Sequence, residues 1–129
     1  MIVLTLRTDK PEAELGVYDD KKQLAYIKWQ AHRELAETTH VKIREILNKS
    51  SKSLKDVEAI VVYKGPGSFT GLRIGLSVAN ALAYSLNAPI VGVTSEDWIE
   101  KGISKLKTGK NSKIALPLYG SEPHITTPK

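Results

Sequence analysis

The sequence contains no cysteine, and only 6% of its 129 residues are aromatic. The absence of cysteine excludes disulfide bonds, cysteine nucleophiles and thiolate metal sites, and it is compatible with a reducing compartment. A secretory signal is also not expected, because the apolar opening Ile2-Val3-Leu4 is far too short for one. We therefore expect a cytoplasmic location.

Charge is missing from one long stretch, since residues 74–94 contain no Asp, Glu, Lys or Arg. A membrane-spanning helix needs about 20 mainly apolar residues. Asn80, Asn87 and Pro89 interrupt this stretch, and Pro89 should end any helix near Asn87. We therefore expect no membrane span. A soluble helix without charge on any face is normally covered on all sides, so part of the cover is expected from another chain.

The formal net charge of +5 arises after Lys49, from lysines that are scattered along the second half of the chain. They are not interleaved with aromatic residues, as they would be in a surface that stacks on bases. Scattered lysines are typical of a solvated surface. We therefore expect any contact with tRNA to be weak or indirect.

Hydrophobic periodicity predicts an alternation of strands and helices after an initial run of strands. A short helical turn is expected at Ser53, which has Asp56 three residues later. Thr94 is expected to cap the third helix, because Asp97 follows at the same spacing. The expected strands are 2–6, 13–18, 23–29, 59–63, 90–93 and 114–119, and the expected helices are 33–48, 71–86 and 95–106.

This order of elements predicts an α/β fold with a mixed sheet, in which three antiparallel strands are followed by parallel strands and flanking helices. The order resembles the ribonuclease-H-like fold, whose unit also builds the lobes of actin-like ATPases. The chain length fits one compact unit, because a chain of this size buries about two-thirds of its surface on folding. We expect one lobe over residues 1–119 and an extended C-terminal tail over 120–129.

A glycine-rich loop follows the expected strand 59–63 and reads Gly65-Pro-Gly-Ser-Phe-Thr-Gly-Leu-Arg-Ile-Gly75. The free backbone N–H groups and the dipole at the start of a helix favour an anion. A phosphate-binding loop would use Gly65, Pro66, Gly67, Ser68, Thr70 and Arg73. The alternative is that the glycines only make a tight corner and let the helix approach its neighbour. No Lys-Ser/Thr pair follows the glycines, so this is not a Walker loop.

Taken literally, the motif over residues 65–75 resembles the signature of the TsaB (YeaZ-type) family, which serves the synthesis of threonylcarbamoyladenosine in tRNA. The strand before it and the segment Pro89–Ser95 after it agree with this resemblance, as does Pro117-Leu118-Tyr119 near the end. The resemblance is strong over residues 30–98 and weaker over residues 1–29.

The resemblance implies a non-catalytic subunit with no required cofactor. In this family TsaB pairs with a related catalytic subunit, TsaD, which transfers the threonylcarbamoyl group to the adenosine beside the anticodon. A small ATPase, TsaE, completes the bacterial assembly, and TsaB alone often forms a homodimer. The resemblance leaves room for ATP or ADP at a shared subunit interface.

The family's partner interface uses two helices, which correspond here to residues 33–48 and 71–86. Small residues at Gly75, Ala79 and Ala83 recur every four positions and would let a partner helix come close. The expected interface residues are Ile43, Leu47, Leu72, Gly75, Leu76, Ala79 and Ala83.

Two departures from the family pattern carry expectations of their own. Family members usually begin Ile-Asp-Thr-Ser, but the matching residues here are Leu6-Arg7-Thr8-Asp9. Arg7 replaces the aspartate expected near a metal–phosphate, and Asp9, two positions displaced, is expected to face differently. After Trp98 the second lobe of the family is not found, so the chain resembles a miniature TsaB that kept the partner-binding lobe.

Several other functions are weighed against this one. A stand-alone nucleotide-binding enzyme of the actin-like ATPase superfamily would act through the loop Gly65–Arg73. A metal site at His32, His40 and His124 is not expected, because their spacing matches no ligand pair. Ser68 lacks the Gly-x-Ser-x-Gly elbow of a serine hydrolase. We therefore expect no catalytic residue and no metal site.

Overall fold

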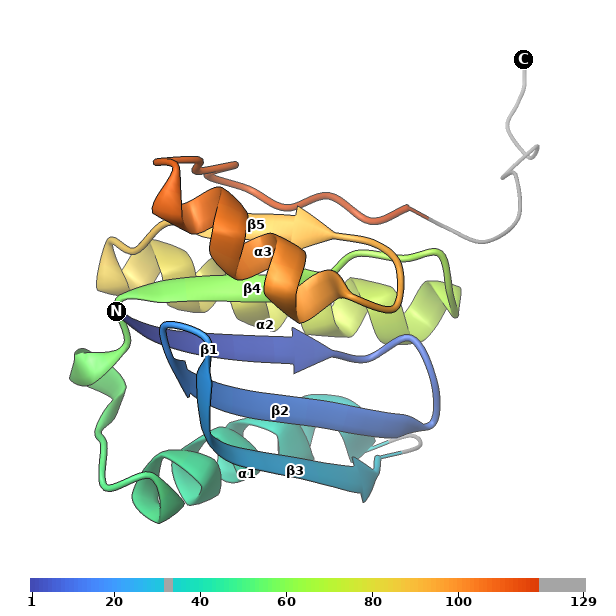
Figure 1. Ribbon diagram of the computed structural model, residues 1–129. Coiled ribbons are helices and arrows are strands. Elements are labelled where there is room, and N and C mark those ends of the chain that lie inside the picture. Colours follow the sequence, from blue (N-terminus) through green and yellow to red (C-terminus); the bar gives the residue numbers. More distant parts are fainter. Residues whose placement is uncertain (32–33, 119–129) are drawn as a thin grey trace.

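The computed structural model describes residues 1–31 and 34–118. Its centre is a five-stranded sheet in the order β3-β2-β1-β4-β5 (Figure 1). β1 pairs antiparallel with β2 and parallel with β4, so the sheet is mixed as the sequence predicts. The strands are β1 (Ile2–Arg7), β2 (Glu12–Asp19), β3 (Lys22–Gln30), β4 (Ala59–Tyr63) and β5 (Ile90–Val93).

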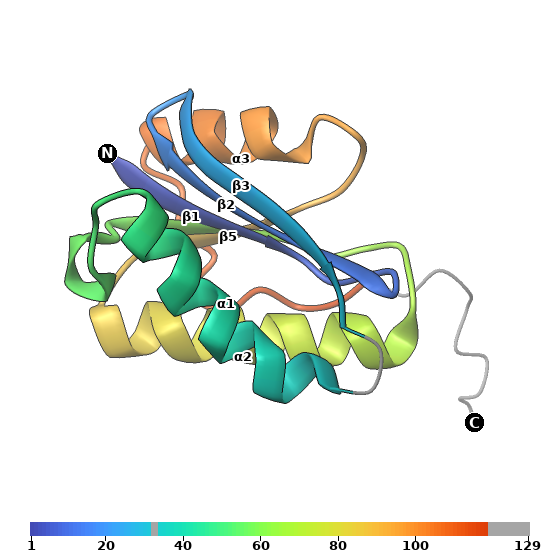
Figure 2. The same cartoon turned by 90° about the horizontal axis from the view of Figure 1, so that it is seen from below.

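Helices cover both faces of the sheet. Seen from below, α1 and α2 lie together on one side of the strands and α3 lies on the other (Figure 2). Each residue of β1 and β4 is buried, because these central strands have a helix layer on either face. The helices are α1 (Leu35–Lys49), α2 (Phe69–Leu86) and α3 (Trp98–Lys107), with a short 3-10 turn, η2 (Leu54–Asp56).

The third helix begins later than the sequence predicts. Its N-cap residue is Asp97, which makes no side-chain capping hydrogen bond, so the expected cap at Thr94 is wrong. The reason is Ser95, whose φ of 78° lies in the left-handed region and therefore cannot belong to a right-handed helix. Ser95 instead turns the chain from β5 toward α3, and its hydroxyl donates to the Asp97 carboxylate at 2.7 Å.

The expected final strand does not form over residues 114–118. The chain from Ser112 to Leu118 instead makes two single contacts, since Ser112 N–H donates to the carbonyl of Ile90 in β5 at 2.7 Å and Leu118 N–H donates to the carbonyl of Lys64, just after β4, at 2.6 Å. Pro117 lacks an N–H group, so a regular ladder cannot continue through it. Tyr119 and the expected tail 120–129 lie outside the described residues.

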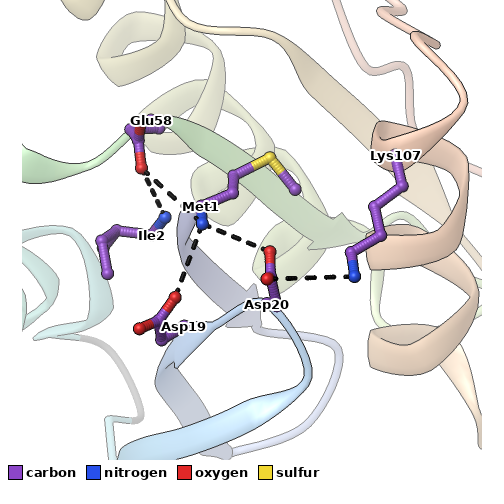
Figure 3. A network of polar contacts seen from close by, with 6 residues as sticks. All are labelled: Met1, Ile2, Asp19, Asp20, Glu58 and Lys107. Carbon is purple, nitrogen blue, oxygen red and sulfur yellow. Dashed lines mark hydrogen bonds and ion pairs between the residues drawn. The ribbon is translucent and has the colours of Figure 1, made fainter.

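The N-terminus is fixed by a network of charged groups (Figure 3). The Met1 ammonium lies 3.2 Å from Asp20 Oδ1 and 3.5 Å from Asp19 Oδ1. Glu58 Oε1 accepts a hydrogen bond of 2.8 Å from the backbone N–H at the start of β1. Lys107 Nζ, at the end of α3, lies 4.0 Å from Asp20 Oδ2. The network therefore joins β1, the β2–β3 turn, the residue before β4 and α3.

The sequence predicts no membrane-spanning helix. Among the described residues, no helix combines the length and the apolar character that crossing a membrane requires.

Candidate functional site

The glycine loop lies between β4 and α2, where the sequence places it. Gly65 has a φ of 124°, a left-handed conformation that side chains rarely adopt, so glycine is needed there. A Cβ on Gly65 would also lie 1.8 Å from the carbonyl oxygen of Leu118. Ser68 is the N-cap of α2, and its hydroxyl oxygen accepts a long hydrogen bond of 3.5 Å from the Gly71 N–H.

The space beside the loop is filled by the residues that follow β1. A Cβ on Gly67 would lie 2.3 Å from the Cβ of Asp9, and a Cβ on Gly75 would lie 1.9 Å from Oγ1 of Thr8. Two hydrogen bonds hold this segment in place. Ser68 N–H donates to the carbonyl of Asp9 at 3.1 Å, and the Thr8 hydroxyl donates to the carbonyl of Gly71 at 2.8 Å. Gly67 and Gly75 therefore allow close packing of the chain. This is the second of the two interpretations that the sequence left open for the loop.

A buried ion pair closes the site at the end of β1. Arg7 Nε donates to Asp9 Oδ1 at 2.7 Å, and Nη2 donates to Oδ2 at 3.2 Å. The guanidinium also lies 3.9 Å from the ring centre of Tyr63, whose hydroxyl donates to the carbonyl of Pro66 at 3.0 Å. Burial by itself would lower the pKa of Arg7, but the hydrogen bond and charge of Asp9 outweigh burial and leave that pKa raised.

Asp9 lies in the bend that follows β1, and its carboxylate turns back to the side chain of Arg7. The two side chains are only 9% and 7% exposed, so the pair is buried. That Asp9 faces differently from the usual aspartate of the family stays a prediction.

The positions beside two glycines of this loop are occupied by other parts of the chain. The place beside Gly67 is taken by Asp9, and the place beside Gly65 by the carbonyl of Leu118. Arg73 is exposed on α2, with its guanidinium 5.5 Å from the ring centre of Phe69, a residue of the same motif. Phosphate binding by Gly65, Pro66, Gly67, Ser68, Thr70 and Arg73 therefore stays a prediction, and no step through a nucleotide follows from it.

The seven residues expected at the partner interface are buried in the chain's own interior. Ile43 is 5% exposed, Ala79 is 1% exposed, and Leu72 is fully buried. Leu47, Gly75, Leu76 and Ala83 are also buried. Leu72, Gly75, Leu76, Ala79 and Ala83 therefore face the chain's own interior, whereas Ile43 and Leu47 also line a groove that opens between α1 and α2. The apolar residues of each helix pack against the chain's own sheet. The sequence alone does not show whether any of them remain available to a partner.

The outward side of α2 is a different set of residues, and it is uncharged after Arg73. Ser77, Ala81 and Ser85 are exposed at four-residue spacing, and Tyr84 beside them is 90% exposed. The α1–α2 face is the name used below for this row together with the exposed side of α1, which includes His40 and Arg44. After Arg73, α2 thus keeps an uncharged outward surface that the described residues do not cover.

A groove lies in the α1–α2 face, between the C-terminal half of α1, the turn η2 and α2. It encloses a cavity of about 330 Å³. Its apolar lining comes from Ile43, Leu47, Leu54 and Leu82, and its rim carries Arg44 and Lys52. Arg44, Lys52, Leu54 and Leu82 are not among the residues that the sequence predicts at a site. The available signal was Leu54, a single large apolar residue within a polar stretch.

The remaining candidates have structural positions. Trp98 is buried with its ring edge-on to Tyr63, at 6.0 Å between ring centres. Trp29 donates from Nε1 to the Thr38 hydroxyl at 3.0 Å. Within residues 1–31 and 34–118, no group of three or more His, Cys, Asp or Glu side chains is placed to hold a metal ion. His40 is exposed on α1, and His32 and His124 lie outside the described residues.

Solved structures define the class of fold. The chain is similar to RuvC of Thermus thermophilus, at 15% identity and a TM-score of 0.51 over 73% of this chain and 64% of that one. This likeness confirms the ribonuclease-H-like fold. Similarity is greater to YeaZ from Pseudomonas aeruginosa, at 25% identity and a TM-score of 0.68 over 78% of this chain and 50% of that one.

The family follows from sequence comparison. Residues 29–112 match the family model described as TsaD, tRNA N6-adenosine threonylcarbamoyltransferase. The chain belongs to this family and is of its TsaB (YeaZ) type, as the sequence motif indicates.

Relatives described as tRNA N6-adenosine threonylcarbamoyltransferase and relatives described as TsaB both match the chain, each over part of the relative's length. A tRNA N6-adenosine threonylcarbamoyltransferase from Geotalea daltonii is 38% identical over 74% of this chain and 28% of the relative. The biosynthesis protein TsaB from Haemophilus influenzae is 34% identical over 72% of this chain and 42% of the relative. TsaB from Buchnera aphidicola aligns with 92% of this chain, at 28% identity, and with 59% of its own length. The chain thus spans between about a quarter and three-fifths of these relatives.

Proposed function

We propose that this chain is a non-catalytic partner subunit, which binds and supports a TsaD-like threonylcarbamoyl transferase in forming threonylcarbamoyladenosine in tRNA. The observation that supports a non-catalytic role is the buried Arg7–Asp9 pair beside the glycine loop. It occupies the end of β1, where a catalytic lobe of this superfamily is expected to present an aspartate toward a metal–phosphate.

The surface proposed to bind the transferase is the α1–α2 face. Its α2 row is uncharged, and its small members, Ser77, Ala81 and Ser85, allow a partner helix to approach closely. The exposed ring of Tyr84 adds an amphipathic side chain of the kind that is enriched at protein interfaces. The proposal also includes a TsaE-like ATPase in the same assembly, a homodimer in the absence of the transferase, and a nucleotide shared between subunits.

The test is to co-express the chain with a TsaD-like protein and to measure both association and tRNA modification. We expect the two proteins to purify together, and we expect modification of tRNA to fall when this chain is omitted. Calorimetry of the isolated chain with ATP and ADP, with and without magnesium, addresses the stand-alone enzyme. Failure to associate would contradict the proposal, as would nucleotide turnover by the isolated chain.

A matched pair of variants locates the interface. Ala81→Arg places a long cation in the outward row of α2, while Ser104→Arg places the same side chain on the exposed surface of α3 across the sheet. We expect Ala81→Arg to weaken retention of the transferase and Ser104→Arg to leave it unchanged. Equal retention by the two variants would place the interface elsewhere.

A further inference from the structure

Exposed lysines surround a cavity between the C-terminal half of α3 and the edge strand β5. The cavity has a volume of about 260 Å³. Its lining comes from β5, from α3 and from the segment after α3, and consists of Val91, Gly92, Lys105, Lys110, Asn111 and Ser112. Lys113 lies beside it, because its N–H donates to Asn111 Oδ1 at 2.9 Å. The lysine patch is the name used below for the exposed residues Lys105, Lys110 and Lys113.

The charge of the lysine patch is not balanced by carboxylates. Residues 101–118 contain five lysines and no Asp or Glu. Two of the five have partners outside the patch, since Lys101 Nζ lies 3.5 Å from Asp97 Oδ1 and Lys107 Nζ lies 4.0 Å from Asp20 Oδ2. Among the described residues, none of the three patch lysines has an ion-pair partner within 4.0 Å. The patch therefore presents three unpaired positive charges.

Asn111 holds the segment that carries the patch against the sheet. Its Oδ1 accepts from the Ile90 N–H at 3.1 Å and from the Lys113 N–H at 2.9 Å. Ser112 N–H donates to the carbonyl of Ile90 at 2.7 Å. The Asn111 NH2 group and the Ser112 hydroxyl have no hydrogen-bond partner within the part of the chain that the structure describes. The cavity is thus lined by two ammonium groups and two uncharged donors.

This set of donors fits phosphate groups better than a peptide or a base. A docked peptide usually anchors an apolar side chain in a pocket, whereas the apolar side chain in this lining is Val91, which is only 2% exposed. A base would stack on an aromatic ring, and the lining residues include no aromatic side chain. Lys, Asn and Ser side chains are typical donors to the phosphates and sugars of nucleic acids.

We propose that the lysine patch binds the phosphate backbone of the tRNA on which the transferase acts. The inference rests on the proposed function, which supplies tRNA as the RNA. α3 lies across the sheet from α1 and α2 (Figure 2), so tRNA at the patch and the transferase at the α1–α2 face can be bound together. The sequence predicts weak or indirect contact with tRNA, because its lysines are scattered along the chain. Three phosphate contacts would make the contact direct but modest in strength.

The first experiment compares two triple substitutions that remove equal charge. One alters the patch and consists of Lys105→Gln, Lys110→Gln and Lys113→Gln. The control alters exposed lysines of β3 and α1 and consists of Lys22→Gln, Lys28→Gln and Lys49→Gln. Fluorescence anisotropy with a labelled tRNA transcript measures binding by the isolated chain. At low salt we expect the patch variant to bind about tenfold more weakly than the wild type, and the control to bind within about twofold of it.

Circular dichroism verifies that both variants fold. Lys110→Gln with Lys113→Gln, which leaves α3 intact, replaces the triple substitution if the latter does not fold. Arginine at the three patch positions keeps the charge and should keep the affinity. Equal losses in the patch variant and the control would overturn the inference, because they would reflect net charge alone. Absence of tRNA binding by the wild type at low salt would also overturn it.

The salt dependence of binding gives a second readout. Each phosphate contact contributes about 0.7 to 0.9 to the slope of log K against log salt concentration, so three contacts contribute about 2 to 3. We expect the slope of the patch variant to be shallower than that of the wild type by about this amount. The slope of the control should not change. Identical slopes for the wild type and the patch variant would contradict phosphate binding at the patch.

A competitor separates RNA from an acidic protein as the occupant. Ile114, which follows Lys113, is 63% exposed and would suit a protein partner. The competitor is therefore a synthetic peptide of alternating glutamate and leucine. We expect it to bind the wild type at least about tenfold more weakly than tRNA does at the same salt concentration. Equal or tighter binding of the peptide, lost in the patch variant, would assign the patch to an acidic protein and overturn the inference.

Measurements with the transferase separate the inference from the proposed function. If the transferase does not associate with the wild-type chain but tRNA binds at the patch, the function fails and phosphate binding by the patch stands. If the transferase associates and tRNA modification depends on this chain, but the patch variant and the control bind tRNA equally well, the function stands and the inference is overturned.

Discussion

Arg7 and Asp9 make a bidentate ion pair whose burial fixes the end of β1. Both charges of such a pair are desolvated. The main effect of the pair on stability is therefore the free energy that is lost when one partner is removed and the other charge stays buried alone. The ring of Tyr63 lies against the guanidinium, which limits the room for water to replace a lost carboxylate. The pair also holds Asp9 where its backbone carbonyl accepts from the Ser68 N–H at the start of α2.

Replacing Arg7 by methionine should therefore destabilise the fold strongly. Arg7→Met leaves the Asp9 carboxylate buried without a partner, and we expect the free energy of unfolding to fall by about 3–5 kcal/mol. Arg7→Met combined with Asp9→Leu removes both charges and should recover part of the loss. Urea denaturation of the single and double variants measures the coupling. Additive effects of the two substitutions would contradict the pairing.

At the scale of single residues, the sequence predicted the position of the glycine loop correctly. It did not predict what the small residues Gly75, Ala79 and Ala83 of α2 contact. The sequence predicted that Gly65 turns the chain between a strand and a helix, and that is its position. It could not show that Thr8 fills the space left by Gly75, because these residues are far apart along the chain. A stripe of small residues indicates close approach but does not indicate which segment approaches.

At the scale of elements, α2 separates an inner surface that holds the fold together from an outer surface available to a partner. Ala79 and Ala81 are two residues apart on this helix, with Ala79 1% exposed and Ala81 exposed. The same substitution at the two positions therefore tests different properties.

Ala79→Arg should unfold or severely destabilise the protein, because it buries an unpaired cation in the core. We expect a loss of about 3 kcal/mol or more in the free energy of unfolding. Ala81→Arg should change it by less than about 0.5 kcal/mol, as is usual for exposed positions. Thermal melts monitored by circular dichroism make the comparison. Equal stability of the two variants would mean that α2 is rotated relative to the sheet.

The network at Met1 joins four elements through charge, so its contribution should depend on pH. A hydrogen bond to Asp20 raises the pKa of the N-terminal ammonium above its ordinary value near 8, and nearby Asp19 adds to the effect. The stabilisation is complete below the unfolded pKa and is lost as pH rises through the folded one. It should be small, because the ammonium is largely solvated.

Thermal melts between pH 7 and pH 10 test this network. We expect the wild type to lose more stability over this range than Asp20→Asn, and we expect added salt to reduce the difference. Glu96→Gln, which removes an exposed carboxylate that is not part of this network, should behave as the wild type. An identical pH dependence of wild type and Asp20→Asn would show that the network contributes nothing.

For the molecule as a whole, the open edge of the sheet is closed by the segment after α3. Asn80 attaches this segment to α2. Its side chain donates to the carbonyl of Ala115 at 2.9 Å and accepts from the Ala115 N–H at 2.8 Å. The segment thus shields β5, which would otherwise present an unpaired edge to other chains. Ile114, Leu116 and Leu118 remain exposed along it.

Asn80→Ala should loosen this closure. Two hydrogen bonds are lost, for a net cost of about 1–2 kcal/mol, and the Ala115 amide should exchange its hydrogen with solvent much faster. Ser77→Ala, on the exposed side of the same helix, is the control and should leave exchange at Ala115 unchanged. Unaltered Ala115 exchange in Asn80→Ala would show that the segment is held by other contacts.

The sequence by itself determined the order of the first five strands and the three helices, the mixed sheet, and the loop motif that identifies the family. These depend on local periodicity and on residue types at fixed spacing, which are present in the linear chain. Only the tertiary structure decided that Thr8 fills the space at Gly75, that most of the expected interface residues are interior, and that Leu54 and Leu82 line one groove. Each of these depends on contacts between residues brought together by the sheet, and periodicity carries no information about which surfaces meet.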